Sequence, residues 1–416
     1  MKKIYKKRII DNSLNTLSKN NIGILITGVK GCGKTESAKQ IAKSEIIIDD
    51  SSKLSELLNI DRTMLISGEK PRLIDEWQLI PWIWNYLRHE IDNGTDGALI
   101  LTGSSTPSPD IKMHSGAGRF VFLHMRPMSW WEIGWSDGMI SLKDIFDNKI
   151  SHTKQYTTKI SEIIKHLTVG GWPFLLGLDV NVGKQLLNGY INGICEIDIS
   201  QVDGVKKDPH MVRRLLRSLA RNIATPVTNR TLINEMGDDA SVSPNTYAKY
   251  YDALERIHIV EDLSAWNVHI RSSASLKKNV KRYFVDPSIA FSILSINEHE
   301  ILNDLNYLGL VFENEVIKNL RIYAEQYNGK LYYYGDSYGN EVDAIIELPD
   351  GSWSAFEIKL GYSGVDKAVK TLKKFMDVVD LSKIGRPKSL NIITFDGILH
   401  KRKDGINVIP LCALKP

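Results

Sequence analysis

The sequence has few cysteines and no long hydrophobic run, and each of these deficits excludes a class of protein. Only three of the 416 residues are cysteine. Cys32, Cys195 and Cys412 lie far apart without a C-x-x-C pair, so neither a disulfide framework nor a zinc site is indicated. No apolar run approaches a membrane span, and the run at residues 22–27 is too short for a signal peptide. We therefore expect a soluble, cytoplasmic protein without membrane contact.

The sequence also lacks a large excess of charge of one sign. A net charge of +4 over 416 residues is too small to indicate nucleic acid binding by itself, although it does not oppose it. Hydrophobic residues make up 43% and charged residues 25%, as in globular proteins. Because the chain is too long for one ordinary core, we expect about two to four domains.

The first third of the chain alternates short apolar runs with helical patterns. This alternation indicates an α/β domain with a parallel sheet flanked by helices. Each run is continuously apolar, as in strands that are buried on both faces. The expected strands are residues 22–27, 46–49, 72–75, 98–102 and 119–123.

A phosphate-binding loop follows the first expected strand. Residues 28–35, GVKGCGKT, match G-x-x-x-x-G-K-[ST] in full, and a helical pattern follows. The glycines let backbone N–H groups turn inward toward phosphate oxygens. We expect Lys34 to reach the β and γ phosphates of ATP and the Thr35 hydroxyl to bind Mg²⁺. The predicted nucleotide-binding residues of the loop are Gly28, Gly31, Cys32, Gly33, Lys34 and Thr35.

Two adjacent carboxylates end the third expected strand. Asp75 is predicted to hold Mg²⁺ together with Thr35, and Glu76 to act as the general base that polarises the attacking water. A D-E pair after apolar residues is a weak signal in isolation, but the loop upstream makes it specific.

Two further residues are predicted to act on the γ phosphate. The strand at residues 98–102 ends in hydroxyls, so Ser104 or Thr102 is predicted to contact this phosphate; a simple Gly-Ser turn is the alternative. Arg119 is predicted to be an arginine finger that acts on a neighbouring subunit, and a surface salt bridge is the alternative.

The pattern becomes helical after residue 140. Residues 161–195 are mainly helical, and Gly170-Gly171-Trp172-Pro173 breaks them. Three helices and a hairpin follow, in the order of a winged helix-turn-helix: residues 211–223, 229–236, 243–257 and 259–285. The third helix is expected to expose residues suited to DNA, namely Asn245, Tyr247, Lys249, Tyr250 and Arg256. A solvated face or a protein-binding module is the alternative.

A hairpin in the last part of the chain brings carboxylates together. Residues 348–351, LPDG, have strong turn chemistry, so the flanking strands pair antiparallel. Residues whose numbers sum to about 700 then face each other, which places Asp343 opposite Glu357 to within one residue. Strand alternation puts Lys359 on the same face. Such a set can bind a divalent ion and activate water.

The motifs occur in an order that resembles the AAA+-superfamily P-loop ATPases (AAA_14 domain) of bacteria and archaea with a C-terminal DUF4143 domain. The similar segments are GVKGCGKT, LIDEWQLIPWIW, ILTGSS, GAGRFVFLHMRPMSWWE, YFVDPSIAFSIL, GLVFENEVIKNL, YYYGDSYGNEVDAIIE and FEIKLG. This resemblance implies an ATPase core, a winged-helix middle and a terminal domain of the PD-(D/E)XK nuclease fold. It also implies that Glu313 joins the set of Asp343, Glu357 and Lys359, although Val342 replaces the proline of the signature.

We accordingly predict four parts, at residues 1–140 (P-loop ATPase), 141–205 (helical lid or linker), 206–300 (winged helix) and 301–416 (PD-(D/E)XK-like). The predicted function is Mg²⁺-dependent ATP hydrolysis coupled to binding of duplex DNA or a protein partner. A homo-oligomer and nuclease activity are left open. The alternative is a nucleotide-switched regulatory, defence or toxin–antitoxin protein with an inactive nuclease fold. A small-molecule kinase is disfavoured, because Glu76 indicates water activation.

Overall fold

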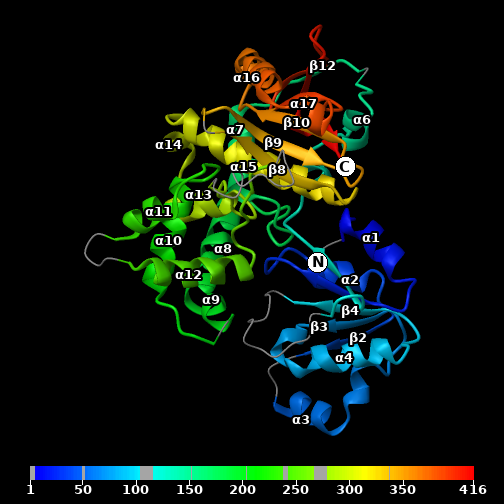
Figure 1. Cartoon of the computed structure of the whole chain (residues 1–416). Coiled ribbons are helices and arrows are strands. Elements are labelled where there is room, and N and C mark those ends of the chain that lie inside the picture. The colour runs from blue at the N-terminus through cyan, green and yellow to red at the C-terminus, as the bar shows by residue number, and fades with distance from the viewer. Residues whose placement is uncertain are drawn as a thin grey trace.

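The chain forms three regions (Figure 1). The N-terminal sheet lies at the bottom of the view, the helices of the middle region at the left, and the C-terminal sheet at the top. This structure is a computed structural model, and it describes residues 5–48, 52–103, 116–150, 152–202, 204–237, 242–266, 279–336 and 338–416. Within these ranges, no helix combines the length and apolar character needed to cross a bilayer.

The N-terminal region is the predicted parallel sheet. Its strands are β1 (Gly23–Thr27), β2 (Ser44–Ile47), β3 (Arg72–Asp75), β4 (Leu99–Thr102) and β5 (Phe120–His124). All pair in parallel, in the order β2-β3-β4-β1-β5. The five expected strands are therefore confirmed, with shifts of one or two residues at their ends. The carboxyl ends of β1 and β3 meet the same edge of the sheet, with β4 between them.

Helices cover both faces of this sheet because the strands are apolar on both sides. Ile24 and Ile26 pack in one core with Leu14 of α1 (Ile10–Leu17) and Ala38 of α2 (Lys34–Lys39). Leu25 packs in the opposite core, with the side chains of α4 (Trp82–Asp92). The helix after the loop is short, since α2 ends at Lys39. The other helices of this region are α3 (Ser52–Ile60) and α5 (Trp130–Ile133).

The middle region is an array of helices. Its members are α7 (Ile160–Val169), α8 (Val180–Gly193), α9 (Ile199–Gln201), α10 (Pro209–Arg221), α11 (Asn229–Met236), α12 (Pro244–Arg256), α13 (Ser288–Leu294) and α14 (Glu298–Leu302). A π-helical turn, Ile194–Asp198, joins α8 to α9. Helix α12 begins as predicted, because the Ser243 side chain accepts from the Thr246 N–H and proline takes the first helical position.

The expected hairpin after α12 consists of two isolated bridges, Val260 with Phe284 and Leu263 with Lys281. The first of its two segments continues to Ala265, which pairs in parallel with Tyr333 of the C-terminal sheet. Three helices followed by this short pairing agree with the expected order, and the winged-helix interpretation stays a prediction.

The C-terminal region is a seven-stranded sheet packed against α15 (Leu305–Glu325) and α16 (Val365–Val378). Its order is β7-β12-β13-β11-β10-β9-β8. The bounds are β7 (Lys154–Tyr156), β8 (Lys330–Gly335), β9 (Glu341–Glu347), β10 (Trp353–Ile358), β11 (Leu390–Thr394), β12 (Gly397–Lys401) and β13 (Asn407–Pro410).

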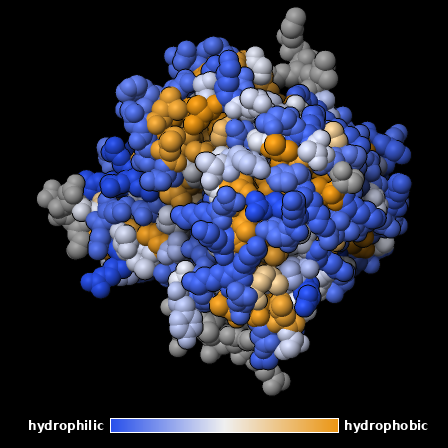
Figure 2. Space-filling model, turned by 90° about the horizontal axis from the view of Figure 1, so that it is seen from above, coloured by the Kyte–Doolittle hydropathy of each residue, from blue (hydrophilic) through white to orange (hydrophobic). Residues whose placement is uncertain are grey.

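Segments from before residue 160 extend the C-terminal region. Strand β7 comes from the stretch that was predicted as a helical lid or linker, and it pairs with β12. Strand β6 (Ile140–Ser141) pairs with β14 (Leu414–Lys415) and leads into α6 (Leu142–Phe146). Within the C-terminal region itself, the short helix α17 (Leu381–Ile384) precedes β11. The chain therefore passes from the first region to the last before it builds the middle one. The face shown in Figure 2 is mainly hydrophilic, with hydrophobic patches between the polar areas.

Candidate functional site

The phosphate-binding loop joins β1 to α2 as the sequence predicts. Gly28, Gly31 and Gly33 have φ angles of 146°, 79° and 102°, a region that glycine adopts without the steric cost of a side chain. A Cβ atom on Gly28 would lie 2.0 Å from the carbonyl oxygen of Met125, so the close approach also requires glycine. Lys34 is buried, and its Nζ donates to the carbonyl oxygens of Gly28 at 2.8 Å and Val29 at 3.0 Å. The loop thus curls around an ammonium group.

Asp75 lies beside the loop, although 40 residues separate it from Thr35. The Thr35 hydroxyl donates to Asp75 Oδ1 at 3.0 Å, and the Thr102 hydroxyl donates to the same oxygen. Thr102 is fully buried, so it orients Asp75 from behind. A hydroxyl and a carboxylate in contact are suitable oxygen ligands for Mg²⁺.

Glu76 has an unusual backbone conformation directly after Asp75. Its φ angle is 53°, which is rare for a residue with a side chain and is often found at functional sites. Its Oε2 accepts from Nε2 of Gln78 at 2.5 Å. Glu76 and the loop residue Lys30 both line a cavity of about 180 Å³.

Ser104 and Arg119 were also predicted to act on the γ phosphate. Ser104 lies outside the described residues. Arg119 lies at the start of β5, at the opposite edge of the sheet from the loop, and its Nε donates to Asp92 Oδ1 at 2.7 Å. Arg119 is therefore not part of its own chain's loop site, and a role toward a neighbouring subunit stays a prediction.

The helical middle region covers the loop. Lys30 Nζ lies 3.0 Å from Asp198 Oδ1, and the Tyr190 hydroxyl donates to the Lys30 carbonyl oxygen at 2.9 Å. The ring of Phe174 lies 3.0 Å from the position that a Cβ atom on Gly31 would occupy. Burial raises the pKa of Tyr190 well above its ordinary value, so this hydroxyl stays a donor. The segment that follows Gly170-Gly171-Trp172-Pro173 therefore touches the loop directly.

An arginine near the N-terminus supports the loop from the other side. Arg8 is buried, and its guanidinium donates to the Cys32 carbonyl oxygen at 2.7 Å, to the Arg126 carbonyl oxygen at 2.7 Å and to Glu132 at 2.9 Å. Sequence analysis missed this residue, because it lies in a basic N-terminal stretch without a pattern of its own. It fixes the backbone of the loop at Cys32.

The four residues of the predicted C-terminal set lie together. Strand β9 pairs with β10 in the expected register, since Trp353 faces Glu347 and Phe356 faces Ala344. Lys359 Nζ lies 2.7 Å from Glu357 and 3.3 Å from Asp343. The Ile358 N–H donates to Asp343 at 2.8 Å. Burial, and then the neighbouring Asp343, raise the pKa of Glu357 to about 8.

A second lysine occupies this set, and sequence analysis missed it. Lys281 Nζ lies 2.9 Å from Glu313, 2.5 Å from Glu341 and 3.4 Å from Asp343. Burial raises the pKa of Glu313 to about 7, although Lys281 lowers it. Among the described residues, no three acidic, histidine or cysteine side chains are arranged to hold a metal ion. The carboxylates thus surround ammonium groups in this conformation.

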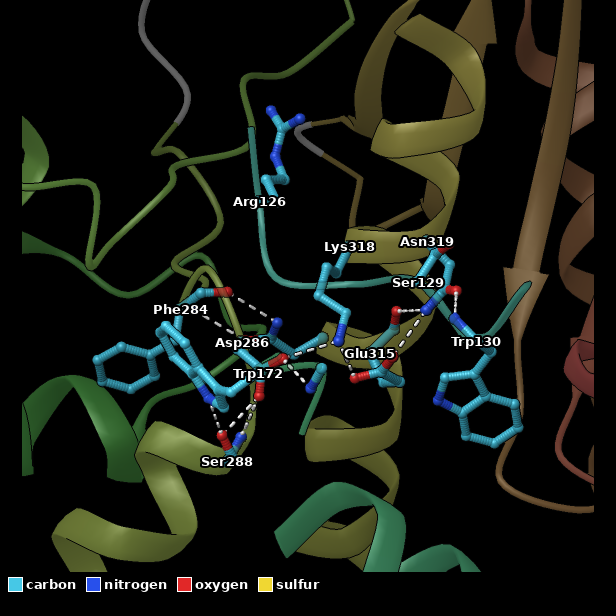
Figure 3. Close-up of polar contacts among 12 residues, drawn as sticks. Arg126, Ser129, Trp130, Trp172, Phe284, Asp286, Ser288, Glu315, Lys318 and Asn319 are labelled. Atoms are coloured by element: carbon cyan, nitrogen blue, oxygen red, sulfur yellow. Dashed lines mark hydrogen bonds and ion pairs between the residues drawn. The ribbon is translucent and has the colours of Figure 1, made fainter. Parts of the chain in front are cut away.

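A buried polar network joins the three regions (Figure 3). Asp286 lies at its centre and is fully buried, with Oδ2 2.8 Å from Lys318 Nζ of α15. The same oxygen accepts from the Gly171 N–H at 2.9 Å, and Trp172 Nε1 donates to the Ser288 hydroxyl at 2.9 Å. The family-like segments YFVDPS and GLVFENEVIKNL therefore supply a clamp between regions.

The clamp continues into the N-terminal region. Lys318 also pairs with Glu315 at 2.8 Å, and Asn319 donates to Glu315 at 2.7 Å. Asn319 Oδ1 in turn accepts from the Trp130 N–H at 2.8 Å. Trp130 is buried at this interface. These contacts connect the segment that touches the loop to the long helix of the C-terminal region.

A second connection starts at the carboxyl end of β5. Arg126 is buried and donates to Glu261 at 2.8 Å and to Glu325 of α15 at 2.7 Å. Burial alone would lower the pKa of Arg126, but the two carboxylates raise it above its ordinary value. Beside it, the rings of His124 and His258 lie 4.8 Å apart. Burial, and then His124, lower the pKa of His258 to about 3, so this ring is neutral at pH 7.

The expected DNA-contacting face of α12 is only partly exposed. Asn245 and Lys249 are exposed, but Tyr247 is buried in the core, contrary to the prediction. The Tyr250 hydroxyl accepts from the Asp208 N–H at 2.9 Å, and Arg256 donates to the Val202 carbonyl oxygen at 3.1 Å. Much of this helix therefore holds the middle region together. The error arose because aromatic residues suit both a core and a DNA surface.

Three family models match consecutive parts of the chain. Residues 20–134 match an AAA domain, residues 160–300 match the domain of unknown function DUF8612, and residues 308–414 match the domain of unknown function DUF4143. No curated protein matches the sequence. The AAA match together with the loop geometry defines the N-terminal region as a P-loop ATPase domain. The DUF4143 match confirms the expected DUF4143 domain, and its PD-(D/E)XK fold stays a prediction.

Several solved structures are similar over much of the chain. The Walker-type ATPase PABY2304 of Pyrococcus abyssi has 12% identity over 70% of this chain and 96% of its own, with a TM-score of 0.43. A DNA replication initiation factor has 14% identity over 59% of this chain and 86% of its own, with a TM-score of 0.25. The STAND protein PH0952 of Pyrococcus horikoshii, which has a tetratricopeptide repeat sensor, has 14% identity over 78% of this chain and 48% of its own, with a TM-score of 0.26. These scores are too low to define the arrangement of the whole chain.

Proposed function

We propose that this protein binds ATP with Mg²⁺ at the loop and hydrolyses it, and that hydrolysis changes the contact between the loop and the regions that cover it. The observation that carries the proposal is the meeting of Lys34, Thr35 and Asp75, where the Thr35 hydroxyl lies 3.0 Å from Asp75. An ammonium group inside a glycine loop binds phosphates, and a hydroxyl beside a carboxylate binds Mg²⁺.

Glu76 is the proposed general base. It follows the proposed metal ligand directly, its backbone is held in a strained turn, and its side chain lines the cavity next to Lys30. Phosphoryl transfer needs little covalent chemistry from the protein, so its main contributions are positioning, charge neutralisation and orientation of water. A carboxylate at this place supplies the last of these.

Replacing Glu76 by glutamine is expected to lower ATP turnover by about 100-fold or more, because the amide cannot accept the proton of water. ATP affinity is expected to persist, since Lys34, Thr35 and Asp75 are unchanged. Phosphate release measures turnover, and equilibrium titration with ATP measures affinity. Glu69→Gln is the matched control, because Glu69 is an exposed carboxylate before β3 and its change leaves turnover as in the wild type. Full turnover in Glu76→Gln would remove this residue from the mechanism.

Coupling to a partner is supported by the contacts that cover the loop. Lys30 and Gly31 touch Asp198, Tyr190 and Phe174 of the middle region. The negative charge of a phosphate bound in the loop would alter the ion pair between Lys30 and Asp198. The position of the middle region relative to the loop would change as a result.

Duplex DNA is the partner proposed for this movement, because Arg217 and Arg221 of α10 and Lys249 of α12 are exposed cations of the middle region. ATP turnover with and without duplex DNA tests this partner. Stimulation by DNA supports it, whereas unchanged turnover favours the nucleotide-switched regulatory protein.

Arg119 is proposed to act on a neighbouring subunit only if the protein assembles, and the effect of Arg119→Ala on turnover at rising protein concentration tests that role.

A further inference from the structure

The carboxylates of the C-terminal domain bind a lysine that comes from outside that domain. Lys281 lies in the hairpin after the middle helices, and only 1% of its surface is exposed. Its Nζ contacts three carboxylates: Glu313 on α15 at 2.9 Å, Glu341 at 2.5 Å and Asp343 at 3.4 Å on β9. Because a buried ammonium group is unfavourable without partners, these three contacts are what hold it there.

The backbone fixes Lys281 in this place. Its N–H donates to the Leu263 carbonyl oxygen at 3.0 Å, and its carbonyl oxygen accepts from the Leu263 N–H at 2.9 Å. Two residues further on, the Tyr283 hydroxyl donates to Glu313 at 2.6 Å. The backbone pairing of the hairpin therefore fixes the position of Lys281.

The Lys281 ammonium takes the place among these carboxylates that a divalent cation would need. Carboxylate oxygens from two different elements converge on one point, and such oxygens are the preferred ligands of Mg²⁺ and related ions. Four carboxylates contact two ammonium groups here, those of Lys281 and Lys359. Glu341 is half-exposed, whereas the Lys281 side chain is almost fully buried. An ion that entered here would meet the charge of Lys281 directly.

We propose that Lys281 is the built-in cation of this carboxylate cluster, where it excludes divalent metal ions, and that a neutral side chain at this position exposes a site of Glu313, Glu341 and Asp343 for one Mg²⁺ or Mn²⁺ ion. Any metal-dependent reaction at the cluster then requires Lys281 to withdraw from it. This inference goes beyond the proposed ATPase activity and does not depend on it.

Titration of the full chain with Mn²⁺ in the absence of nucleotide tests the proposal, with free Mn²⁺ measured by electron paramagnetic resonance. Lys281→Met keeps an unbranched side chain one atom shorter than lysine and removes its charge. We expect this variant to gain one Mn²⁺ site that binds at least about 10-fold more tightly than any site of the wild type, because a unit charge close to the ion is removed. Adding Asp343→Asn to Lys281→Met is expected to abolish the gained site.

Two further proteins complete the test. Lys373→Met removes an exposed lysine of the same domain, paired with Asp404 at 3.1 Å, and is expected to gain no site. Lys281→Gln is a second neutral variant if the methionine variant does not fold, as judged by circular dichroism. The proposal is overturned if a folded neutral variant binds Mn²⁺ no better than the wild type. It is also overturned if the wild type already holds a tight Mn²⁺ ion that Asp343→Asn removes.

Discussion

Lys34→Ala is expected to lower ATP turnover by about 10²–10³-fold, the usual effect of removing a positioned group that stabilises transition-state charge. Lys34 is the cation inside the loop, where its Nζ lies 2.8 Å from the Gly28 carbonyl oxygen. These carbonyl contacts hold the ammonium group inside the loop, where it would also contact the oxygens of a bound phosphate. Alanine leaves the glycine backbone intact but removes the charge that neutralises the β and γ phosphates.

Lys43→Ala is the matched control for this variant. Lys43 is an exposed lysine shortly after α2, so its removal changes the net charge equally without touching the loop. Phosphate release is measured for both variants beside the wild type, over a range of ATP concentrations. Turnover in Lys34→Ala that stays close to that of Lys43→Ala would show that the loop is not the site of hydrolysis.

Asp286→Ala is expected to lower the free energy of unfolding by about 3–5 kcal/mol, the usual cost of removing one partner of a buried ion pair. Asp286 is fully buried and pairs with Lys318 at 2.8 Å. It also accepts from the Gly171 N–H at 2.9 Å and from the Ser288 hydroxyl at 2.6 Å. Its removal leaves a backbone donor without its partner and reduces the negative charge around Lys318.

Urea unfolding measures this loss, with fluorescence of the buried tryptophans as the signal. Asp366→Ala is the control, because this aspartate is 86% exposed and pairs with Arg402 at 3.4 Å. A surface ion pair contributes about 0–1 kcal/mol, so the control should unfold almost as the wild type does. If both variants lost equally little free energy of unfolding, the clamp between the regions would not depend on Asp286.

The clamp explains motifs that lie far from the loop. Asp286 and Ser288 come from YFVDPS, and Glu315, Lys318 and Asn319 come from GLVFENEVIKNL. Their side chains bind one another and the segment at Gly171. These residues therefore connect the region that touches the loop with the long helix of the C-terminal domain.

Local patterns predicted the parts of the protein that local sequence determines. The glycine loop, the five parallel strands and the start of α12 at Ser243 depend on residues next to each other in the chain. The β9–β10 hairpin was also predictable, because its turn fixes the register that brings Asp343 and Glu357 together. Strong turn chemistry determines such pairings over short distances.

The missed features depend on contacts between distant segments. Lys281 is separated by 32 residues from Glu313 and by 62 residues from Asp343. Arg8 reaches Glu132 across 124 residues. Neither Lys281 nor Arg8 belongs to a sequence motif. A single basic residue in a polar stretch is usually exposed, so the sequence did not indicate that either is buried. Strand β7 was missed for the same reason, because its partner β12 lies at the other end of the chain.

Equilibrium titration of the purified chain with ATP and Mg²⁺ tests the proposed nucleotide site directly. We expect saturable binding of one nucleotide per chain that weakens strongly without Mg²⁺ and in Thr35→Val, since Thr35 lies 3.0 Å from Asp75 beside the loop. Absence of binding, or binding that is unchanged by loss of Mg²⁺ and by this substitution, would contradict it.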